Sequence, residues 1–238
     1  MQLFYSPTLN QDVETYIFDK EESKHIVKVL RKKEEDIIHI TNGLGLLCQA
    51  EIVYANEKKC EVRILNRTHF SKHNYHLHLM VAPTKTNERF EWFVEKATEM
   101  GIDEITPIIT EHSERKEVKI ERFEKIVLSA MKQSLQYFLP KINQPIKFKQ
   151  LMQQDIEGDR YLAHCEEVEK QQLANQDLRA KKITILIGPE GDFSSEEIST
   201  ALSKGYKPIA LGNTRLRTET AAVYSVCVVA SQNENPKF

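Results

Sequence analysis

The amino-acid sequence predicts an α/β protein preceded by a small β-rich domain. Residues 1 to about 70 contain short strand-like segments separated by turn signals, such as the Asn-Gly-Leu-Gly run at residues 42–45. From residue 76 onward, strand-like and helix-like segments alternate, which indicates a largely parallel sheet. A length of 238 residues suits two modest domains better than three. We therefore expect domains at residues 1–70 and 74–238.

Composition and charge exclude several classes of protein. The chain is 40% hydrophobic and 29% charged with only 8 glycines and 8 prolines, which is typical of a folded globular protein and not of a disordered one. A net charge of −2 gives no general attraction for nucleic acid, so any RNA affinity must come from a local basic patch. No apolar run reaches the roughly 20 residues that cross a bilayer, and residues 1–7 lack a signal-peptide pattern. We expect a cytoplasmic protein without a membrane partner.

Cysteine and histidine spacing gives little support for metal or disulfide chemistry. The chain has four widely spaced cysteines without a CxxC pair: Cys48, Cys60, Cys165 and Cys227. Three of the four stand in apolar or strand-like surroundings typical of buried thiols, so we expect neither a disulfide nor a zinc ion. His76 and His78 alternate along one predicted strand, but no third ligand stands nearby, and a structural role is favoured over a metal site.

A basic stripe runs along the one helical pattern of the N-terminal region, residues 21–31. Lys24, Lys28 and Arg31 recur at helical spacing, on a different side from the apolar Ile26. Such a stripe can contact RNA phosphates. Four nearby glutamates weaken its field and fit a solvated helix face equally well, so both interpretations stay open.

The first chemical signal is a glycine-containing loop after a predicted strand, residues 183–187. Gly188-Pro-Glu-Gly191 follows this strand, and Ser194 and Glu197 then have the spacing of a capping box for a helix ending near Gly205. Such a loop allows a ligand to approach the backbone at the carboxyl end of a strand, although an ordinary turn has the same pattern. The absence of GxGxxG and GK[ST] argues against NAD and ATP.

A second glycine loop follows about 25 residues later. A predicted strand at residues 208–211 leads into Gly212 and a short loop, and an apolar helix is predicted over residues 218–231. This helix is too apolar for a one-sided surface helix. We expect it to be buried within the domain or against a partner subunit.

These segments resemble the signatures of the RsmE family, which methylates N3 of a uridine in 16S ribosomal RNA. The two loops with their neighbours, residues 187–194 and 211–221, look like the family's two C-terminal signatures. Four upstream blocks occur in the same order: residues 82–85, 91–92, 95–101 and 133–134. Residues 25–31 and 42–45 match its N-terminal part, so the resemblance covers nearly the whole chain.

The resemblance implies a fold, a cofactor and partners. It implies an N-terminal PUA-like β-barrel and a C-terminal SPOUT α/β domain with a deep trefoil knot in about residues 183–235. It also implies S-adenosyl-L-methionine as cofactor, 16S rRNA or the small ribosomal subunit as substrate, a homodimer with the site at the subunit boundary, and no metal. Two alternatives remain open: a non-enzymatic RNA-binding or ribosome-assembly scaffold, and a SPOUT methyltransferase acting on another base or on tRNA.

The same resemblance indicates site residues. Arg217 and Glu219 are the catalytic candidates, since a cation can stabilise the uracil anion and a carboxylate can accept its proton. Arg217 could instead pair with a phosphate or with Glu190, and Glu219 could merely favour the helix N-terminus electrostatically. The expected cofactor-binding residues are Leu186, Ile187, Gly188, Pro189, Glu190, Gly191, Leu211, Gly212, Leu216 and Thr220. The expected RNA contacts are Lys24, Lys28, Arg31, Lys85, Arg89 and Arg215, and Lys96 could either join them or pair with Glu99.

The sequence departs from the family pattern at three places. Asp192 replaces a glycine common after the first loop, residues 135–136 (Leu-Gln) stand for the usual Gly-Arg, and residues 214–215 (Thr-Arg) stand for Arg-Ile. The last two departures change basic residues. If the missing arginine normally holds RNA, Arg215 or Lys132 can substitute for it.

Overall fold

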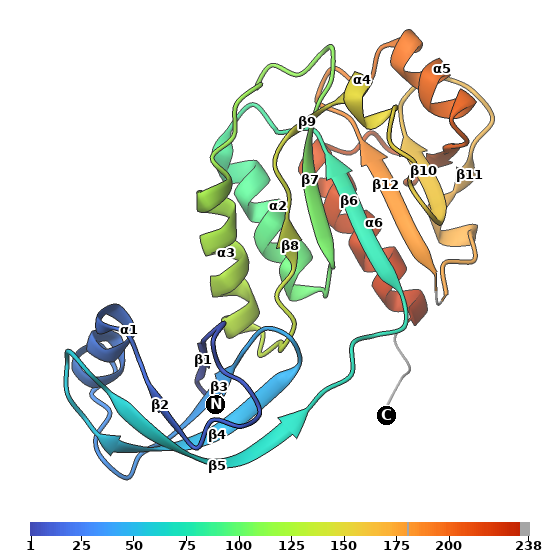
Figure 1. Ribbon diagram of the computed structural model, residues 1–238. Coiled ribbons are helices and arrows are strands. Elements are labelled where there is room, and N and C mark those ends of the chain that lie inside the picture. Colours follow the sequence, from blue (N-terminus) through green and yellow to red (C-terminus); the bar gives the residue numbers. More distant parts are fainter. Residues whose placement is uncertain (180, 234–238) are drawn as a thin grey trace. The chain divides into compact units, whose positions relative to one another are not determined.

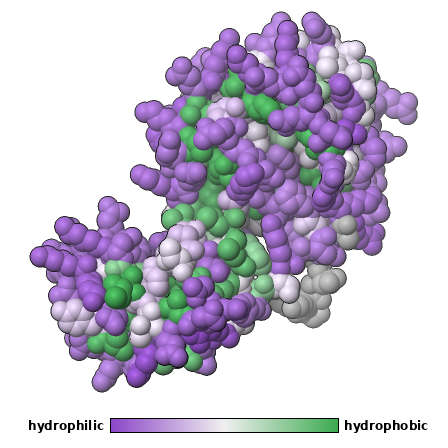
Figure 2. Space-filling view, viewed as in Figure 1, coloured by the Kyte–Doolittle hydropathy of each residue, from purple (hydrophilic) through white to green (hydrophobic). Residues whose placement is uncertain are grey.

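The computed structural model describes residues 1–179 and 181–233, which divide into two compact units (Figure 1). The first unit comprises Met1–Lys72 together with Met131–Leu139, and the second comprises His73–Ala130 and the chain from Pro140 onward. Hydrophilic residues cover most of the surface of each unit on the face shown in Figure 2. No helix within the described residues is long and apolar enough to cross a membrane.

The first unit is built on a five-stranded sheet with the order β1-β3-β4-β5-β2. Strand β1 runs parallel to β3, and the other neighbours are antiparallel. The strands are β1 (Leu3–Tyr5), β2 (Thr15–Ile17), β3 (Ile37–Thr41), β4 (Leu46–Tyr54) and β5 (Glu61–His69). Turn signals in the sequence predicted the three longest strands, whereas the three-residue β1 and β2 are too short to show a period of two.

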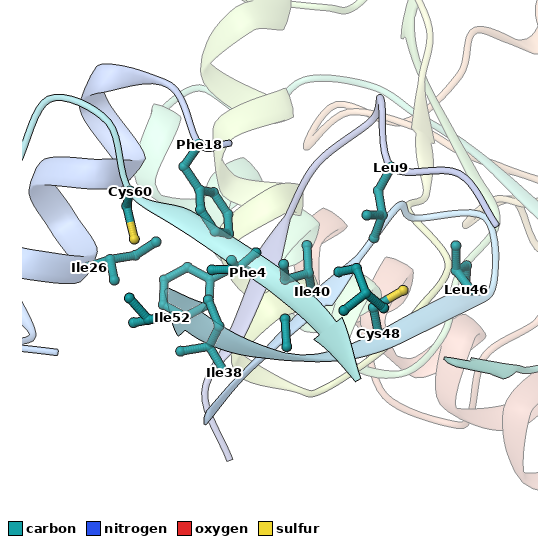
Figure 3. Close-up of a cluster of buried hydrophobic side chains, with 13 residues drawn as sticks. Phe4, Leu9, Phe18, Ile26, Ile38, Ile40, Leu46, Cys48, Ile52 and Cys60 are labelled. Carbon is teal, nitrogen blue, oxygen red and sulfur yellow. The ribbon is translucent and has the colours of Figure 1, made fainter. Parts of the chain in front are cut away.

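Buried and partly exposed side chains alternate along β4, and the buried ones contribute to the core of this unit. Side chains of β4 are buried at every second position from Leu46 to Ile52, as expected for a strand with one face toward the core. These residues meet Phe4, Phe18 and Ile26 in one apolar cluster (Figure 3). The edge-to-face packing of Phe4 on Phe18, with ring centroids 5.9 Å apart, is a favourable aromatic geometry.

The predicted helix at residues 21–31 is only partly α-helical. Helix α1 covers Lys20–Lys24 and continues as a π-helix, η1, over His25–Val29. The amide of Leu30 donates to the carbonyl of His25 at 2.9 Å, and Arg31 then takes a left-handed backbone with φ of 55°. The π-turn places Ile26 fully in the core. The expectation that Lys24, Lys28 and Arg31 form a stripe along one regular α-helix is therefore wrong.

Residues Met131–Leu139 pack with the first unit, although the sequence analysis placed them in the second domain. Their backbone pairs with the glycine turn: the amide of Gly45 donates to the carbonyl of Tyr137, and the amide of Leu139 donates to that of Gly43, each at 2.9 Å. Helix α3 covers Ile120–Gln133 and ends before these paired residues, and Leu135 has φ of 56°. This left-handed position is one where the family usually has glycine.

The second unit contains an eight-stranded parallel sheet with the path β11-β13-β10-β12-β6-β7-β8, and β9 pairs with β7 off this path. Three of its strands lie where the sequence predicts them: β12 (Lys182–Ile187), β13 (Lys207–Ala210) and β6 (His76–Val81), which carries His76 and His78. The others are β7 (Glu104–Ile109), β8 (Lys141–Ile142), β9 (Ile146–Lys147), β10 (Asp159–Ala163) and β11 (Gln171–Gln172). The consecutive buried residues of β12 explain its continuous apolar sequence, since helices or loops cover both faces of a parallel sheet.

Helices cover the two faces of this sheet (Figure 1). Helix α2 (Asn87–Glu99) packs against α6 (Thr218–Asn233), which also contacts β6 and β12. On the other face, α4 (Phe148–Leu151) and α5 (Ser195–Ser203) contribute to an apolar cluster with Met80, Leu162 and Leu186. A short 3₁₀ helix, η2, spans Leu173–Asn175. Both α6 and the glycine loops therefore belong to one layered core.

All four cysteines are free thiols, but only two of them are buried. Cys48 and Cys60 lie in the core of the first unit, whereas Cys165 and Cys227 are exposed. The expectation of three buried thiols is wrong, because Cys165 follows the end of β10. Within residues 1–179 and 181–233, no group of three potential ligands could hold a metal ion.

His76 and His78 lie at the start of β6 and surround one carboxylate. Their ring nitrogens are 3.6 and 3.8 Å from Glu104 on the neighbouring strand. Nε2 of His78 is also 2.7 Å from Oγ1 of Thr106. Burial lowers the pKa of His78 to about 4, although Glu104 acts in the opposite direction. His78 is therefore a neutral structural histidine at neutral pH.

We predict that His78 makes the protein less stable as the pH falls below 6.5. Because its pKa in the folded protein lies below the unfolded value of 6.5, the unfolded chain takes up a proton first, and stability is lost as the pH falls toward about 4. Between about pH 6.5 and pH 5, urea unfolding of the His78→Asn variant should depend less on pH than that of the wild type. The same change of unfolding free energy with pH in both proteins would contradict a lowered pKa of His78.

Candidate functional site

Two glycine-containing loops leave the carboxyl ends of two parallel strands in the sheet of the second unit. The first loop, residues 188–193, follows β12, and the second, residues 211–217, follows β13. Strand β10 lies between these strands, because Ala163 is in register with Ile187 on one side and Ile209 on the other. The carboxyl edge of such a sheet is where α/β proteins bind small molecules.

A buried hydrogen bond joins the two loops. The hydroxyl of Thr218, at the start of α6, donates to the carbonyl of Gly188 at 3.1 Å. Thr218 and Glu219 are both buried, and Gly188 and Pro189 are buried as well. This bond places the end of the second loop directly against the beginning of the first. The two segments, thirty residues apart, therefore form one continuous wall.

The first loop turns sharply at Asp192, which stands where the family often has glycine. Asp192 has φ of 62°, in the left-handed region that glycine adopts without strain. Its carboxylate offsets this cost by accepting two backbone hydrogen bonds, from Phe193 at 2.9 Å and from Cys165 at 2.6 Å. Aspartate tolerates left-handed backbone better than most residues because its side chain bonds locally. The departure from glycine is thus accommodated within the loop.

The predicted capping box after this loop is confirmed. The side chain of Ser194 accepts from the amide of Glu197, and the carboxylate of Glu197 accepts from the amide of Ser194. The other carboxylate oxygen of Glu197 accepts from the amide of Glu111 at 3.0 Å. The start of α5 is therefore fixed to the segment that follows β7.

Two neighbouring segments, those of His112 and Lys85, hold the first loop in place. Nδ1 of His112 lies 3.1 Å from the carbonyl oxygens of both Gly191 and Asp192, so it must carry the proton and donate. The amide of Lys85 donates to the carboxylate of Glu190 at 3.1 Å. Glu190 is thus a structural anchor of this loop.

The second loop also depends on glycine. Gly212 has φ of 115°, a conformation that L side chains rarely adopt, and its amide donates to the side chain of Gln172 at 2.9 Å. A guanidinium nitrogen of Arg215 is 3.5 Å from the carbonyl oxygen of Glu190, which links the second loop to the first. Leu211 and Leu216 are half-buried at its two ends.

The catalytic candidates differ in exposure. Arg217 is exposed, and within the described residues its side chain has no hydrogen bond or ion pair, including with Glu190. Glu219 is only 7% exposed, and its Oε1 lies 3.8 Å from Nε of Arg89. Thr220, an expected cofactor residue, is exposed on α6. The site thus presents a free cation beside a buried carboxylate.

The structure separates the predicted RNA contacts into groups. Lys85 is exposed and pairs with Glu114 at 3.0 Å, while Lys96 pairs with Glu95 and Glu99. Lys96 therefore has the ion-pair role that the sequence left open. Lys24, Lys28 and Arg31 belong to the first unit, and of these Lys28 lies 4.0 Å from Glu57.

Sequence reasoning missed three residues near the loops: His112, Gln172 and His164. His112 and Gln172 bond to backbone groups of the loops, and such contacts leave no local pattern in the sequence. His164 follows β10, is 8% exposed, and has no hydrogen bond to either ring nitrogen among the described residues. Burial lowers its pKa, and Lys170 acts in the same direction.

Two family models match this chain. A model described as an RNA methyltransferase domain matches residues 71–230, and one described as an RNA methyltransferase PUA domain matches residues 18–65. The proteins named ribosomal RNA small subunit methyltransferase E from Buchnera aphidicola and Aquifex aeolicus are each 30% identical to it. The Buchnera match covers 90% of this chain and 87% of that protein, and the Aquifex match covers 96% and 99%.

The chain belongs to the ribosomal RNA small subunit methyltransferase E family. The predicted resemblance to RsmE is thereby confirmed, as is an α/β methyltransferase domain with a PUA-like domain before it.

Solved structures agree with this membership along nearly the full chain. A protein from Porphyromonas gingivalis is 36% identical with a TM-score of 0.87, and the match covers 98% of both chains. A Legionella pneumophila protein, solved with the bound cofactor SAM, is 27% identical with a TM-score of 0.86 over 96% of both chains.

We predict that replacing Gly212 weakens ligand binding through the local strain in the second loop and not through a general loss of folding stability. A side chain at φ of 115° strains the second loop, so Gly212→Ala should weaken S-adenosylmethionine binding by about tenfold or more. Gly101→Ala is the matched control, because Gly101 has φ of 81° at the end of α2, away from both loops. Calorimetric titration should find the control unchanged. Equal weakening in both variants would indicate a general loss of stability.

Proposed function

We propose that this protein is an S-adenosylmethionine-dependent methyltransferase that modifies N3 of a uridine in 16S rRNA of the small ribosomal subunit. Family membership and the SAM-bound Legionella relative support the reaction class. The observation that carries the proposal is the hydrogen bond from Thr218 to Gly188, because it assembles both signature loops into one site.

The residues of this site fit such a cofactor. The backbone at Gly188 and Pro189 is buried, and the ring of Phe193 lies 3.0 Å from where a side chain of Gly188 would begin. The loop backbone is therefore held in a fixed arrangement, and its polar groups can orient a heterocycle. The carboxylate of Glu219 has one buried oxygen without a hydrogen-bond partner among the described residues, which leaves an acceptor available to the base that the cofactor methylates. We assign the cofactor to the predicted set: Leu186, Ile187, Gly188, Pro189, Glu190, Gly191, Leu211, Gly212, Leu216 and Thr220. When bound, S-adenosylmethionine supplies an electrophilic methyl group on a sulfonium.

The chain's own residues then orient and deprotonate the acceptor. The loops and the start of α6 hold the uridine so that N3 lies about 3 to 3.5 Å from the methyl carbon. Because N3 of neutral uridine carries a proton, a group must remove it. Glu219 accepts this proton, and the unpaired guanidinium of Arg217 stabilises the negative charge that develops on the uracil.

RNA affinity comes from local cations, since the whole chain has a net charge of −2. In the second unit, Lys85 and Arg215 are exposed on the two sides of the loops and contact phosphates. In the first unit, the PUA-like domain contributes Lys24, Lys28 and Arg31. The left-handed backbone of Arg31 turns the chain directly after the π-helix, a type of irregularity frequent at functional sites.

The path of the chain supports a knot in about residues 183–235 and a homodimer. Strand β13 lies beyond β10, yet α6 returns to contact β6, β12 and α2, which requires the chain to pass back across the sheet. Exposed aromatic residues on two packed helices, Trp92 of α2 and Tyr224 of α6, provide an apolar surface for a second copy. The barrel form of the first unit and the domain limits 1–70 and 74–238 are proposed on the same family basis.

Transfer of a labelled methyl group tests the proposed function. Small ribosomal subunits, naked 16S rRNA and tRNA that lack this modification are incubated with labelled S-adenosylmethionine, and nucleosides are identified by mass spectrometry. We expect 3-methyluridine in 16S rRNA and about a hundredfold slower transfer by Arg217→Ala, with unchanged cofactor binding. The control is Arg115→Ala, because Arg115 is half-buried and, among the described residues, its side chain donates to the carbonyl of Glu117.

Other outcomes would redirect the proposal. Label in another nucleoside or in tRNA would retain methyl transfer and change the target. Cofactor binding without transfer to any RNA would contradict the enzymatic assignment and favour a scaffold.

A further inference from the structure

Glu219 has an unusual environment for a carboxylate in the first turn of a helix. It is only 7% exposed, whereas acidic residues at this position normally lie in solvent. Its Oε1 faces Nε of Arg89 at 3.8 Å, a charge contact too long for a hydrogen bond. Its Oε2 is buried and has no hydrogen-bond partner in the described part of the chain. One oxygen is therefore near a cation and the other is unsatisfied.

This arrangement leaves one carboxylate oxygen available as an acceptor. Glu219 stands in the first turn of α6, and the guanidinium of Arg89 lies near its other oxygen. A buried acceptor without a partner is costly, and native proteins keep such atoms where a ligand or water completes them. Glu219 follows Thr218, whose hydroxyl joins the two loops, so the backbone of Glu219 lies at the junction of the proposed methyl-transfer site.

We propose that Arg89 is a positioning residue for Glu219 and not the phosphate contact that the sequence suggested. Arg89 fixes Oε1 and keeps Oε2 free for the proton of uridine N3. This inference rests on the proposed function. Arg89 lies in the first turn of α2, which packs on α6, so the pair is built from two helices of one core.

The proton balance of this step is complete. The N3–H bond breaks and its proton goes to Oε2 of Glu219, while the electron pair of N3 forms the bond to the methyl carbon. The carbon–sulfur bond breaks and its electron pair stays on sulfur, which leaves a neutral thioether. One positive sulfonium and one negative carboxylate are consumed, so charge is conserved. The protonated Glu219 afterwards returns its proton to water.

Arginine variants separate the positioning role from phosphate contact. We expect Arg89→Gln to lower kcat by about ten- to a hundredfold, with little change in KM for the subunit, because the loss occurs in the chemical step. Arg89→Lys should recover part of this loss. The Arg89→Gln/Glu219→Gln double variant should be no slower than Glu219→Gln alone, since residues that act as a unit are not additive.

The salt dependence of RNA binding gives an independent test. Removal of one phosphate contact reduces the magnitude of the slope of log K against log salt by about 1. We expect this for Lys85→Gln and not for Arg89→Gln. Arg122→Gln is the matched control for losing an ion-paired arginine, because Arg122 bonds to Glu91 at 2.8 Å on the surface of α2 and α3. It should change neither kcat nor the slope.

Three results would overturn the inference. A reduced salt slope with unchanged kcat in Arg89→Gln would make Arg89 a phosphate contact. Loss of cofactor binding in Glu219→Gln would assign Oε2 to the cofactor instead of the uridine. If the wild type transfers the methyl group and Arg89→Gln has the same kcat, the positioning role alone is rejected. If the wild type transfers no methyl group, the proposed function and this inference are rejected together.

Discussion

The buried hydrogen bond from Thr218 to Gly188 is the constraint on which the rest of the candidate site depends. It connects the start of α6 to the carboxyl end of β12 across thirty residues of sequence. Among the described residues, the other side-chain hydrogen bonds of the loop after β13 are exposed, such as the 3.5 Å approach of Arg215 to Glu190. With the bond from Thr218, Glu219 is held at the same junction as the backbone of the first loop. A single short contact thus makes two loops into one site.

The surrounding structure stabilises loops that are conformationally costly. Asp192 and Gly212 both adopt left-handed backbone, and each is fixed by hydrogen bonds from other segments. His112 donates to two carbonyl groups of the first loop and Lys85 donates its amide to Glu190. These contacts prepare the backbone for a ligand before it binds, which reduces the entropy that binding must overcome. Rigidity of the loops and their function are therefore linked.

Local patterns in the sequence predicted the elements but not the contacts between them. The apolar run of β12 and the spacing of Ser194 and Glu197 have local causes, namely burial on two faces and capping, and both were predicted. The ion pair of Arg89 with Glu219 joins residues 130 positions apart, and no local pattern encodes it. The π-helix was not predicted either, because it depends on the packing of Ile26 with residues distant in sequence. Family resemblance supplied candidate site residues that periodicity could not.

Cofactor affinity of a Thr218→Val variant tests the central claim most directly. Valine keeps the shape of threonine but cannot donate to Gly188, so any change reports the loss of one hydrogen bond of about 1 to 2 kcal/mol. Calorimetric titration with S-adenosylmethionine should then give about tenfold weaker binding, with far-UV circular dichroism unchanged. Unchanged affinity in a folded variant would show that the two loops form the site without this bond, and would contradict the account.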